Sequence, residues 1–203
     1  MLLHVASRVA ESADALNEAD RAIGDGDHGV AMTRGFDAAR HELESREYET
    51  VGAPIAEVGR ALLLSMGGAS GILFSSLFVV GAGGLAADRS FGSAELARFL
   101  GDGTDAVAQR GRTAPGAKTM VDALAPAART ADELRSEPLA DALPRIAAAA
   151  RDGVEATKEM VALAGKARSL GERAVGHADP GAMSVHVVLQ AIDEYVTTRA
   201  AAR

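Results

Sequence analysis

Apolar residues recur at steps of three and four along almost the whole chain, and this periodicity constrains the fold more than any other feature. In the most regular stretch, residues 138–165, the apolar residues form one continuous stripe. No stretch alternates with a period of two for long enough to indicate a strand. Aromatic residues make up 3% of the chain and Trp is absent, so the core must consist mainly of Ala, Leu, Val and Ile, which suits closely packed helices. We therefore predict an all-α fold.

The 203 residues are enough for one domain with a sizeable core, and 48% of them are hydrophobic, which argues against disorder. The first helix is expected over residues 2–20 and the second from Val30 to Glu44, and Pro54 suits the first turn of a third. Continuing in this way, the pattern gives about eight helices with no linker between them. We predict a single domain over residues 1–203.

Charge and cysteine content exclude several classes of function. The net charge of −7 argues against binding to nucleic acid or to an anionic membrane surface. The chain has no cysteine, hence no disulfide and no thiolate metal ligand, which fits a cytoplasmic protein. Residues 1–8 also lack the basic and apolar regions of a secretion signal.

One long segment, from Ala61 to Ala87, carries no charge and therefore raises the question of a membrane span. Small and polar residues interrupt it, including Gly67–Gly71 and Ser75–Ser76. Two buried helices joined by residues 66–71 explain this composition better than a transmembrane helix does. The glycines of residues 81–84 lack the third glycine and the βαβ pattern of a dinucleotide-binding fingerprint.

The segment Asp20–Gly29 places three carboxylates and a histidine among three glycines, directly after a helical stretch. Asp20, Asp25 and Asp27 could not converge on a continued helix, because only positions three or four apart share a face. Glycine permits sharp turns and positive φ, so a loop could direct all three carboxylates inward. Convergent carboxylates repel one another unless a cation lies between them, and Mg²⁺ prefers oxygen ligands. The segment therefore suggests a Mg²⁺-phosphate site.

Two other interpretations of this segment have to be weighed. An isolated Asp-Gly-Asp sequence is more often a solvated turn than a binding site. An EF-hand loop fails on spacing, because counting from Asp25 puts Phe36 at the twelfth position, where a bidentate Glu is needed.

Three further unusual loops strengthen the site interpretation: Gly67–Gly71, Gly111–Thr119 and Arg168–Gly181. Together with the acidic segment they fall at every second junction between the expected helices, and alternate junctions of an up-and-down bundle lie at the same end. The second of these loops resembles a phosphate-binding P-loop but has one residue too many before Lys118, and no strand precedes it. We expect all four loops to share one end of the bundle.

The four loops together resemble the nucleotide-binding L subunit of dihydroxyacetone kinase, the DhaL family. The matching segments follow in order along nearly the whole chain: Asp20-x4-Asp25-Gly26-Asp27-His28-Gly29, Gly67-Gly68-Ala69-Ser70-Gly71, Lys118-Thr119-Met120-x-Asp122, and Gly171-Glu172-Arg173 through Gly176-His177-x-Asp179-Pro180-Gly181-Ala182. The resemblance implies a single-domain antiparallel eight-helix barrel that holds Mg²⁺ and an adenine nucleotide, ADP or ATP, in loops at one end.

The resemblance also implies roles for individual residues. The metal ligands would be Asp20, Asp25 and Asp27, holding Mg²⁺, expected as two ions that bridge the nucleotide phosphates. The residues implied to contact the phosphates, largely through main-chain N–H groups, are His28, Gly29, Val30, Ala31, Ala69 and Ser70. Gly111 and Met120 are implied to line the base pocket. Arg168 is implied to neutralise phosphate charge. The residues implied to approach the nucleotide by their backbone are Asp179, Pro180 and Gly181. For His28, a hydrogen-bond orienter or phosphate contact is favoured over a general base.

The function implied by the resemblance is that of a kinase subunit. It would bind ADP or ATP and deliver a phosphoryl group to dihydroxyacetone, or a related short ketose, held on a separate K subunit. The phosphoryl donor is left open between ATP and a phosphotransferase-system protein, and a homodimer is left open as well. One alternative is a nucleotide domain related to fatty-acid or acyl-phosphate kinases, although their loop usually continues with Thr-Gly rather than His28-Gly29. Another is a non-catalytic helical module that binds metal or nucleotide.

Overall fold

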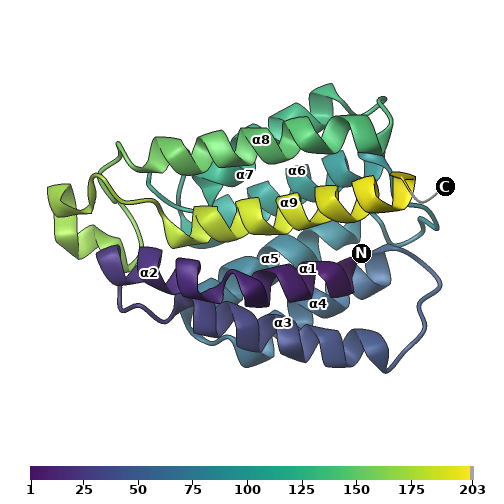
Figure 1. Ribbon diagram of the computed structural model, residues 1–203, viewed down its shortest axis with the longest axis horizontal. Coiled ribbons are helices and arrows are strands. Elements are labelled where there is room, and N and C mark those ends of the chain that lie inside the picture. Colours follow the sequence, from purple (N-terminus) through teal and green to yellow (C-terminus); the bar gives the residue numbers. More distant parts are fainter. Residues whose placement is uncertain (202–203) are drawn as a thin grey trace.

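A computed structural model describes residues 1–201, which form nine α-helices, one 3₁₀-helix and no strand (Figure 1). The elements in chain order are α1 (Leu2–Glu11), α2 (Ala13–Ile23), α3 (His28–Glu44), α4 (Gly52–Ser65), α5 (Gly68–Gly83), α6 (Ser93–Gly111), α7 (Val121–Glu133), α8 (Leu139–Thr157), η1 (Lys166–Ala174) and α9 (Pro180–Ala201). The prediction of an all-α fold is confirmed.

The helices form a closed ring of eight antiparallel members, in which α1 and α2 together count as one. From α3 to α9 each long helix packs against the next along the chain, and α1 closes the ring by packing against both α3 and α9. Helix α2 continues the course of α1 and packs against α3, α9 and η1 (Figure 1). The expected antiparallel eight-helix barrel is therefore the observed architecture.

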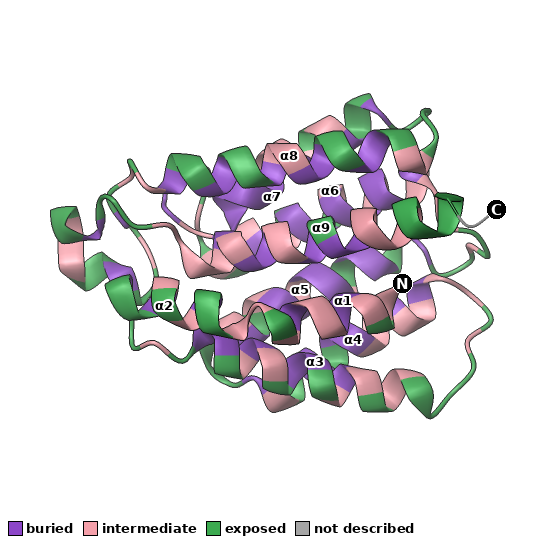
Figure 2. Cartoon of the chain, viewed as in Figure 1, coloured by how far each residue is buried: buried purple, intermediate pink, exposed green. Residues whose placement is uncertain are grey.

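The interior of the ring is a continuous core made largely of Ala, Leu and Val, as the composition indicates. Buried positions face the axis of the ring on every helix, while exposed positions face outward (Figure 2). The few aromatic rings meet near the centre, where Phe78 lies 6.1 Å from Phe36 and 5.7 Å from Phe99 between ring centroids. Edge-on and tilted ring pairs of this kind add to the stabilisation from apolar burial.

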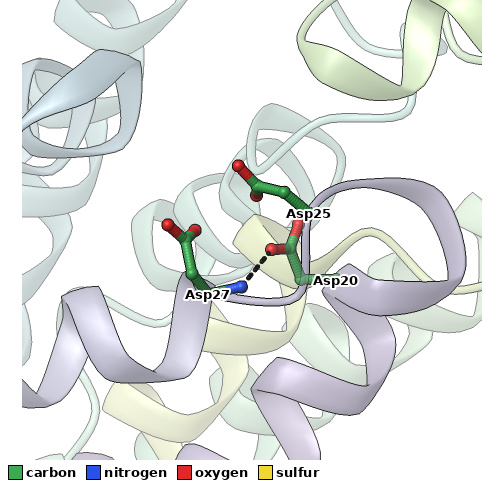
Figure 3. Close-up of side chains that lie close together, drawn as sticks. All are labelled: Asp20, Asp25 and Asp27. Carbon is green, nitrogen blue, oxygen red and sulfur yellow. Dashed lines mark hydrogen bonds between the residues drawn. The ribbon is translucent and has the colours of Figure 1, made fainter.

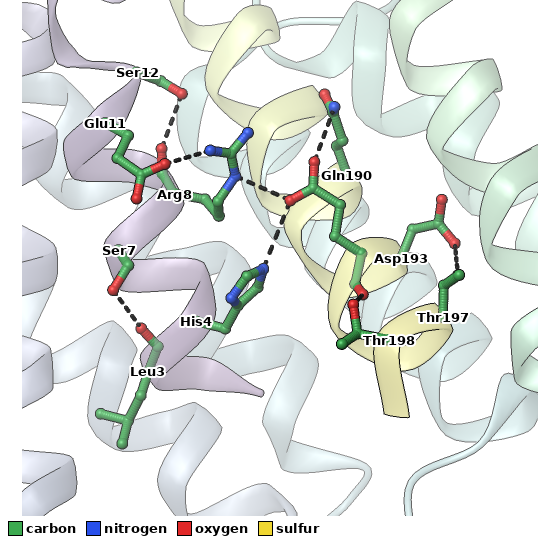
Figure 4. A network of polar contacts seen from close by, with 11 residues as sticks. Leu3, His4, Ser7, Arg8, Glu11, Ser12, Gln190, Asp193, Thr197 and Thr198 are labelled. Carbon is green, nitrogen blue, oxygen red and sulfur yellow. Dashed lines mark hydrogen bonds and ion pairs between the residues drawn. The ribbon is translucent and has the colours of Figure 1, made fainter. Parts of the chain in front are cut away.

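The contact that closes the ring carries a polar network on its outer side (Figure 4). The guanidinium group of Arg8 on α1 lies 2.9 Å from the carboxylate of Glu194 on α9 and also pairs with Glu11. His4 lies 3.6 Å from the same Glu194 carboxylate. Half-exposed ion pairs contribute little to stability, so apolar packing between α1 and α9 is the main contribution to closure.

Two expected helix boundaries were wrong. The first helix does not run unbroken over residues 2–20, because the chain breaks between α1 and α2 at Ser12, whose N–H is shared among carbonyls of the preceding turn. The stripe over residues 138–165 is helical only to Thr157, and Val161 and Ala164 lie in the loop that follows. The remaining expected starts are close to those observed, and Pro54 lies in the first turn of α4.

The uncharged segment forms the last part of α4 and the whole of α5, joined at Met66 and Gly67. Over residues 1–201 the structure has no helix that combines the length and apolarity needed to cross a membrane.

Two glycines on α6 provide a matched test of how closely α5 and α6 approach. A Cβ atom at Gly103 would lie 2.8 Å from the Leu77 carbonyl oxygen, whereas one at Gly101 would meet no heavy atom of the described residues within 4 Å. We expect Gly103→Ala to destabilise the fold by roughly 1–3 kcal/mol through overpacking. We expect Gly101→Ala to stabilise it by about 0.5–1 kcal/mol, because alanine restricts the unfolded chain and favours helix. Urea unfolding of both variants measures this difference, and equal stabilities would contradict the close approach.

Candidate functional site

A cavity of about 640 Å³ opens at the end of the ring that carries the unusual loops. Its lining comes from the α2–α3, α4–α5 and α6–α7 junctions and from the segments before and after η1. Segments more than one hundred residues apart in sequence therefore meet at one place, which confirms that the four loops share one end. In Figure 1 this is the end where η1 lies, opposite the N- and C-termini.

The acidic loop is organised by Asp20, which lies in the last turn of α2 and is only 7% exposed. One oxygen of its carboxylate, Oδ2, accepts hydrogen bonds from the backbone N–H groups of Gly26, Asp27 and His28, at 2.9, 3.0 and 3.2 Å. Figure 3 shows the bond to Asp27. Gly26 has φ of +79°, a conformation that favours glycine. Asp20 thus sets the path of the loop while its second oxygen, Oδ1, takes none of these bonds.

Asp25 and Asp27 complete a group of three carboxylates (Figure 3). Their side chains are 52% and 70% exposed, and one oxygen from each of the three aspartates lies within 4.8 Å of the others. A set of convergent carboxylate oxygens at the edge of an open cavity suits a hard divalent cation, which also keeps positions for water or phosphate. The residues present therefore fit a Mg²⁺ ion.

A cation that the sequence pattern did not single out lies beside these carboxylates. Lys166, the first residue of η1, lines the cavity and forms an ion pair with Asp25, and its ammonium nitrogen lies 3.9 Å from an Asp27 oxygen. The hydrogen bond to Lys166 lowers the pKa of Asp25, and the same bond raises the pKa of Lys166. Arg168 is exposed, and among residues 1–201 it does not belong to the cavity lining.

His28 joins two sides of the cavity by a buried hydrogen bond. It begins α3, and its Nε2 atom lies 2.8 Å from the hydroxyl oxygen of Ser184 on α9. That hydroxyl donates to the carbonyl oxygen of Pro180 at 3.1 Å, so the ring nitrogen is the donor to Ser184. Burial lowers the pKa of His28, which favours the neutral ring. The hydrogen bond to Ser184 fixes the ring and so supports an orienting role for His28.

Four α-helices begin at the cavity, namely α3, α5, α7 and α9. Backbone N–H groups in a first helical turn lack intrahelical partners, and the helix dipole favours negative charge there. At α5 the backbone has φ of +73° at Gly67 and +61° at Gly68, and Ala69 and Ser70 line the cavity. Several helix N-termini around one cavity make a strong anion-binding arrangement.

The first turn of α3 divides between cavity and surface. His28 and Ala31 line the cavity, whereas Gly29 and Val30 lie outside the lining formed by residues 1–201. Val30 is 56% exposed, and its N–H already donates to the side chain of Asn17 at 3.1 Å. Gly29 packs against α2, where a Cβ atom would lie 2.0 Å from a backbone oxygen. The absence of a side chain at Gly29 therefore serves helix packing.

The opposite part of the cavity is more apolar. Met120 and Gly111 line it together with Leu73 and Val107, so a flat apolar ring would find suitable walls there. Beside Met120 lie the remaining sequence-predicted residues, Asp179, Pro180 and Gly181, at the start of α9.

Asp179 caps α9, since one of its carboxylate oxygens accepts a hydrogen bond from the N–H of Ala182 at 2.7 Å. Burial raises the pKa of Asp179 from the ordinary 3.8 to about 7. Between these values the folded state holds a proton that the unfolded chain has lost. The contribution of Asp179 to the free energy of unfolding therefore falls as the pH rises from about 4 to about 7, and is constant above that.

Asp179→Asn should remove this dependence while keeping an oxygen for the helix cap. Chemical unfolding of both proteins at about pH 5 and about pH 8 provides the test. We expect the wild type to lose about 1–3 kcal/mol more stability than the variant over this interval, less than the full pKa difference implies because the residue keeps some contact with solvent. Parallel pH profiles would contradict the raised pKa.

Comparison with known proteins agrees with this architecture. The family model described as the DAK2 domain matches residues 22–194. The chain is 38% identical over 173 residues to the PEP-dependent dihydroxyacetone kinase, ADP-binding subunit DhaL, of Escherichia coli (strain K12), covering 84% of this chain and 82% of that protein. It is 33% identical to the L-erythrulose 1-kinase of Mycolicibacterium smegmatis, covering 93% of this chain but 33% of that protein.

Among solved structures, the dihydroxyacetone kinase from C. freundii in complex with AMP-PNP and Mg²⁺ superposes with a TM-score of 0.71 at 25% sequence identity. The match covers 96% of this chain and 33% of that chain, so this protein corresponds to about one third of that kinase. The family match extends over most of the sequence, and the helical ring is shared with the solved kinase. The chain therefore belongs to the DAK2 domain family.

Proposed function

We propose that this protein is the nucleotide-binding subunit of a kinase that phosphorylates dihydroxyacetone or a related short ketose. The observation that carries the proposal is the cavity itself, where three carboxylates converge beside the N-termini of four helices. The carboxylates suit a divalent cation and the helix N-termini suit phosphate, and a nucleotide with its metal needs both. The relatives named as an ADP-binding subunit and as kinases support the same conclusion.

The cofactors proposed are ADP or ATP with Mg²⁺, expected as two ions. Asp20, Asp25 and Asp27 would hold the metal, which when bound would neutralise phosphate charge. Asp20 is already oriented by its three backbone hydrogen bonds, so little rearrangement of that ligand is needed. The Mg²⁺ and AMP-PNP bound to the C. freundii kinase support this choice of cofactors.

The residues of this chain contribute mainly positioning, which is what phosphoryl transfer asks of a protein. The first turn of α5 would direct backbone N–H groups at the phosphates, with the Ser70 hydroxyl beside them, and Gly181 would offer the N–H of α9. His28 would keep α3 and α9 in register through Ser184. Met120 and Gly111 would bound the base, and Lys166 would face the phosphates from the edge of the acidic loop.

The acceptor is proposed to lie on a separate substrate-binding K subunit. The E. coli relative is described as one subunit of its kinase, and the C. freundii kinase is about three times as long as the matched part. Because the E. coli relative is described as PEP-dependent, a phosphotransferase-system protein is the proposed source of the phosphoryl group. Free exchange of bound nucleotide with added ATP would instead favour ATP as the donor.

The metal assignment can be tested by changing Asp25, which is exposed and can lose its charge without disturbing the core. We expect Asp25→Asn to weaken Mg²⁺-dependent ADP binding by at least about tenfold while the helical content stays unchanged. Calorimetric titration with ADP, with and without Mg²⁺, measures the effect. Asp14→Asn, an equal charge change at an exposed position of α2, is the control. Unchanged Mg²⁺-dependent binding by the Asp25 variant would refute its role as a ligand.

The cation facing the phosphates can be identified by comparing Lys166 with Arg168. Because Lys166 lines the cavity, we expect Lys166→Met to weaken ADP binding by about fivefold to tenfold, through loss of a charge-assisted hydrogen bond. Arg168→Met should have the smaller effect, because Arg168 is exposed and lies outside the described lining. A larger effect of the Arg168 substitution would instead indicate that Arg168, the residue implied by the sequence, contacts the phosphates.

A further inference from the structure

Lys118 is an unusual lysine because its side chain is buried in the wall of the cavity. The residue is 1% exposed and lies in the loop between α6 and α7. Its backbone has φ of +58°, a left-handed conformation that side chains other than glycine rarely adopt. Desolvation lowers the pKa of its ammonium group, while the charges of Asp179 and Asp122 raise it. A buried charge and a strained backbone both cost stability, so a compensating role is expected at this position.

The ammonium group ties the ends of two other segments to its own loop. It donates one hydrogen bond to the carbonyl oxygen of Thr157, the last residue of α8, and another to that of His177, in the loop before α9, each at 2.5 Å. The Thr157 hydroxyl in turn accepts a hydrogen bond from the N–H of Asp179 at 3.0 Å. Lys118 therefore connects the loop before α7, the end of α8 and the start of α9.

Further backbone contacts show that these segments form one wall. The N–H of Leu163 donates to the carbonyl oxygen of Ala117 at 3.1 Å, and that of Gly176 donates to Lys158 at 2.7 Å. Across the same wall, a Cβ atom at Gly181 would lie 3.3 Å from the Cβ of Met120. The cavity-lining residues Met120 and Gly181 are thus in direct contact. Met120 lies two residues after Lys118, and Gly181 lies four residues after His177.

The loop of Lys118 has its own internal support. The Asp122 carboxylate accepts hydrogen bonds from the N–H groups of Gly116 and Thr119, at 2.5 and 2.8 Å. Removing the ammonium would therefore leave the loop folded but weaken its attachment to the end of α8 and the start of α9. It would also remove one donor from the carbonyl groups of Thr157 and His177, and Thr157 would keep only the hydrogen bond from the N–H of Met160, at 3.2 Å.

We propose that Lys118 is a positioning residue that sets how tightly the nucleotide is held. Its ammonium group fixes the wall formed by Met120 on one loop and by Asp179–Gly181 on the other, and so keeps the base side of the cavity closed. The proposal rests on the proposed function, because the ligand in question is the nucleotide. Lys118 acts through the wall and needs no contact with the phosphates or the metal.

The first experiment compares Lys118→Met with Arg112→Met. Arg112 lies in the same loop and also has a left-handed backbone, with φ of +50°, but it is exposed and lies outside the described cavity lining. We expect Lys118→Met to raise the dissociation constant for ADP with Mg²⁺ by about tenfold or more, mainly through faster release of a fluorescent ADP analogue. Arg112→Met should stay within about twofold of the wild type, since it removes the same charge without breaking the wall.

Chemical rescue separates positioning from a general loss of stability. The chain has no cysteine, so Lys118→Cys would carry the only thiol. Bromoethylamine converts that thiol, in denaturant, into an aminoethyl side chain with an ammonium group at nearly the length of lysine. After refolding, we expect the modified variant to regain most of the affinity for ADP, while the unmodified variant stays weak. Wild-type protein taken through the same treatment is the control.

Amide hydrogen exchange gives a readout that does not depend on nucleotide. Exchange at Leu163, Gly176 and Asp179 should become at least about tenfold faster in Lys118→Met and return toward wild type after aminoethylation. Affinity for ADP within about twofold of wild type in Lys118→Met, or no recovery after modification, would overturn the proposal. If the wild type itself bound no ADP, the proposed function would fail. Amide exchange alone would then decide whether Lys118 fixes the wall.

Discussion

The repulsion between three carboxylates held within 4.8 Å of one another is the constraint on which the site depends. The protein offsets it from two directions before any metal is considered. Within the loop, Asp20 directs one oxygen at three backbone N–H groups, so its charge also defines the loop path. From the other end of the chain, Lys166 pairs with Asp25. The acidic loop therefore connects segments near the two ends of the chain.

The antiparallel, closed ring explains why loops distant in sequence form one cavity. With antiparallel helices, every second junction falls at the same end, so loops from four places in the sequence surround one cavity. All four junctions lead into helices that begin at the cavity, α3, α5, α7 and α9. Despite the net charge of −7, the backbone N–H groups at these helix starts and Lys166 would favour an anion here, because they act at short range whereas the remaining charges are screened over about 8–10 Å.

Much of this was predictable from the sequence, because it depends on local patterns. Apolar periodicity predicts the helices, and the glycines around Asp25 predict a turn that gathers the carboxylates. The end of α8 was not predictable. Val161 and Ala164 continue the apolar stripe, yet the helix stops at Thr157, whose carbonyl and hydroxyl groups bond to segments elsewhere in the chain. Tertiary hydrogen bonds of this kind leave no periodic trace in the sequence.

The two lysines that line the cavity show the same limit of sequence-based prediction for charged side chains. Lys118 belongs to a motif that the sequence did single out, but its burial depends on carbonyl acceptors 39 and 59 residues away. For Lys166, the short 3₁₀ turn after Gly165, with φ of +67°, decides which basic side chain of the segment faces the carboxylates. A basic loop residue can thus be recognised from sequence, whereas its direction follows only from the backbone. In this family fold, one lysine then orders the apolar wall, while the other balances the acidic loop across the same cavity.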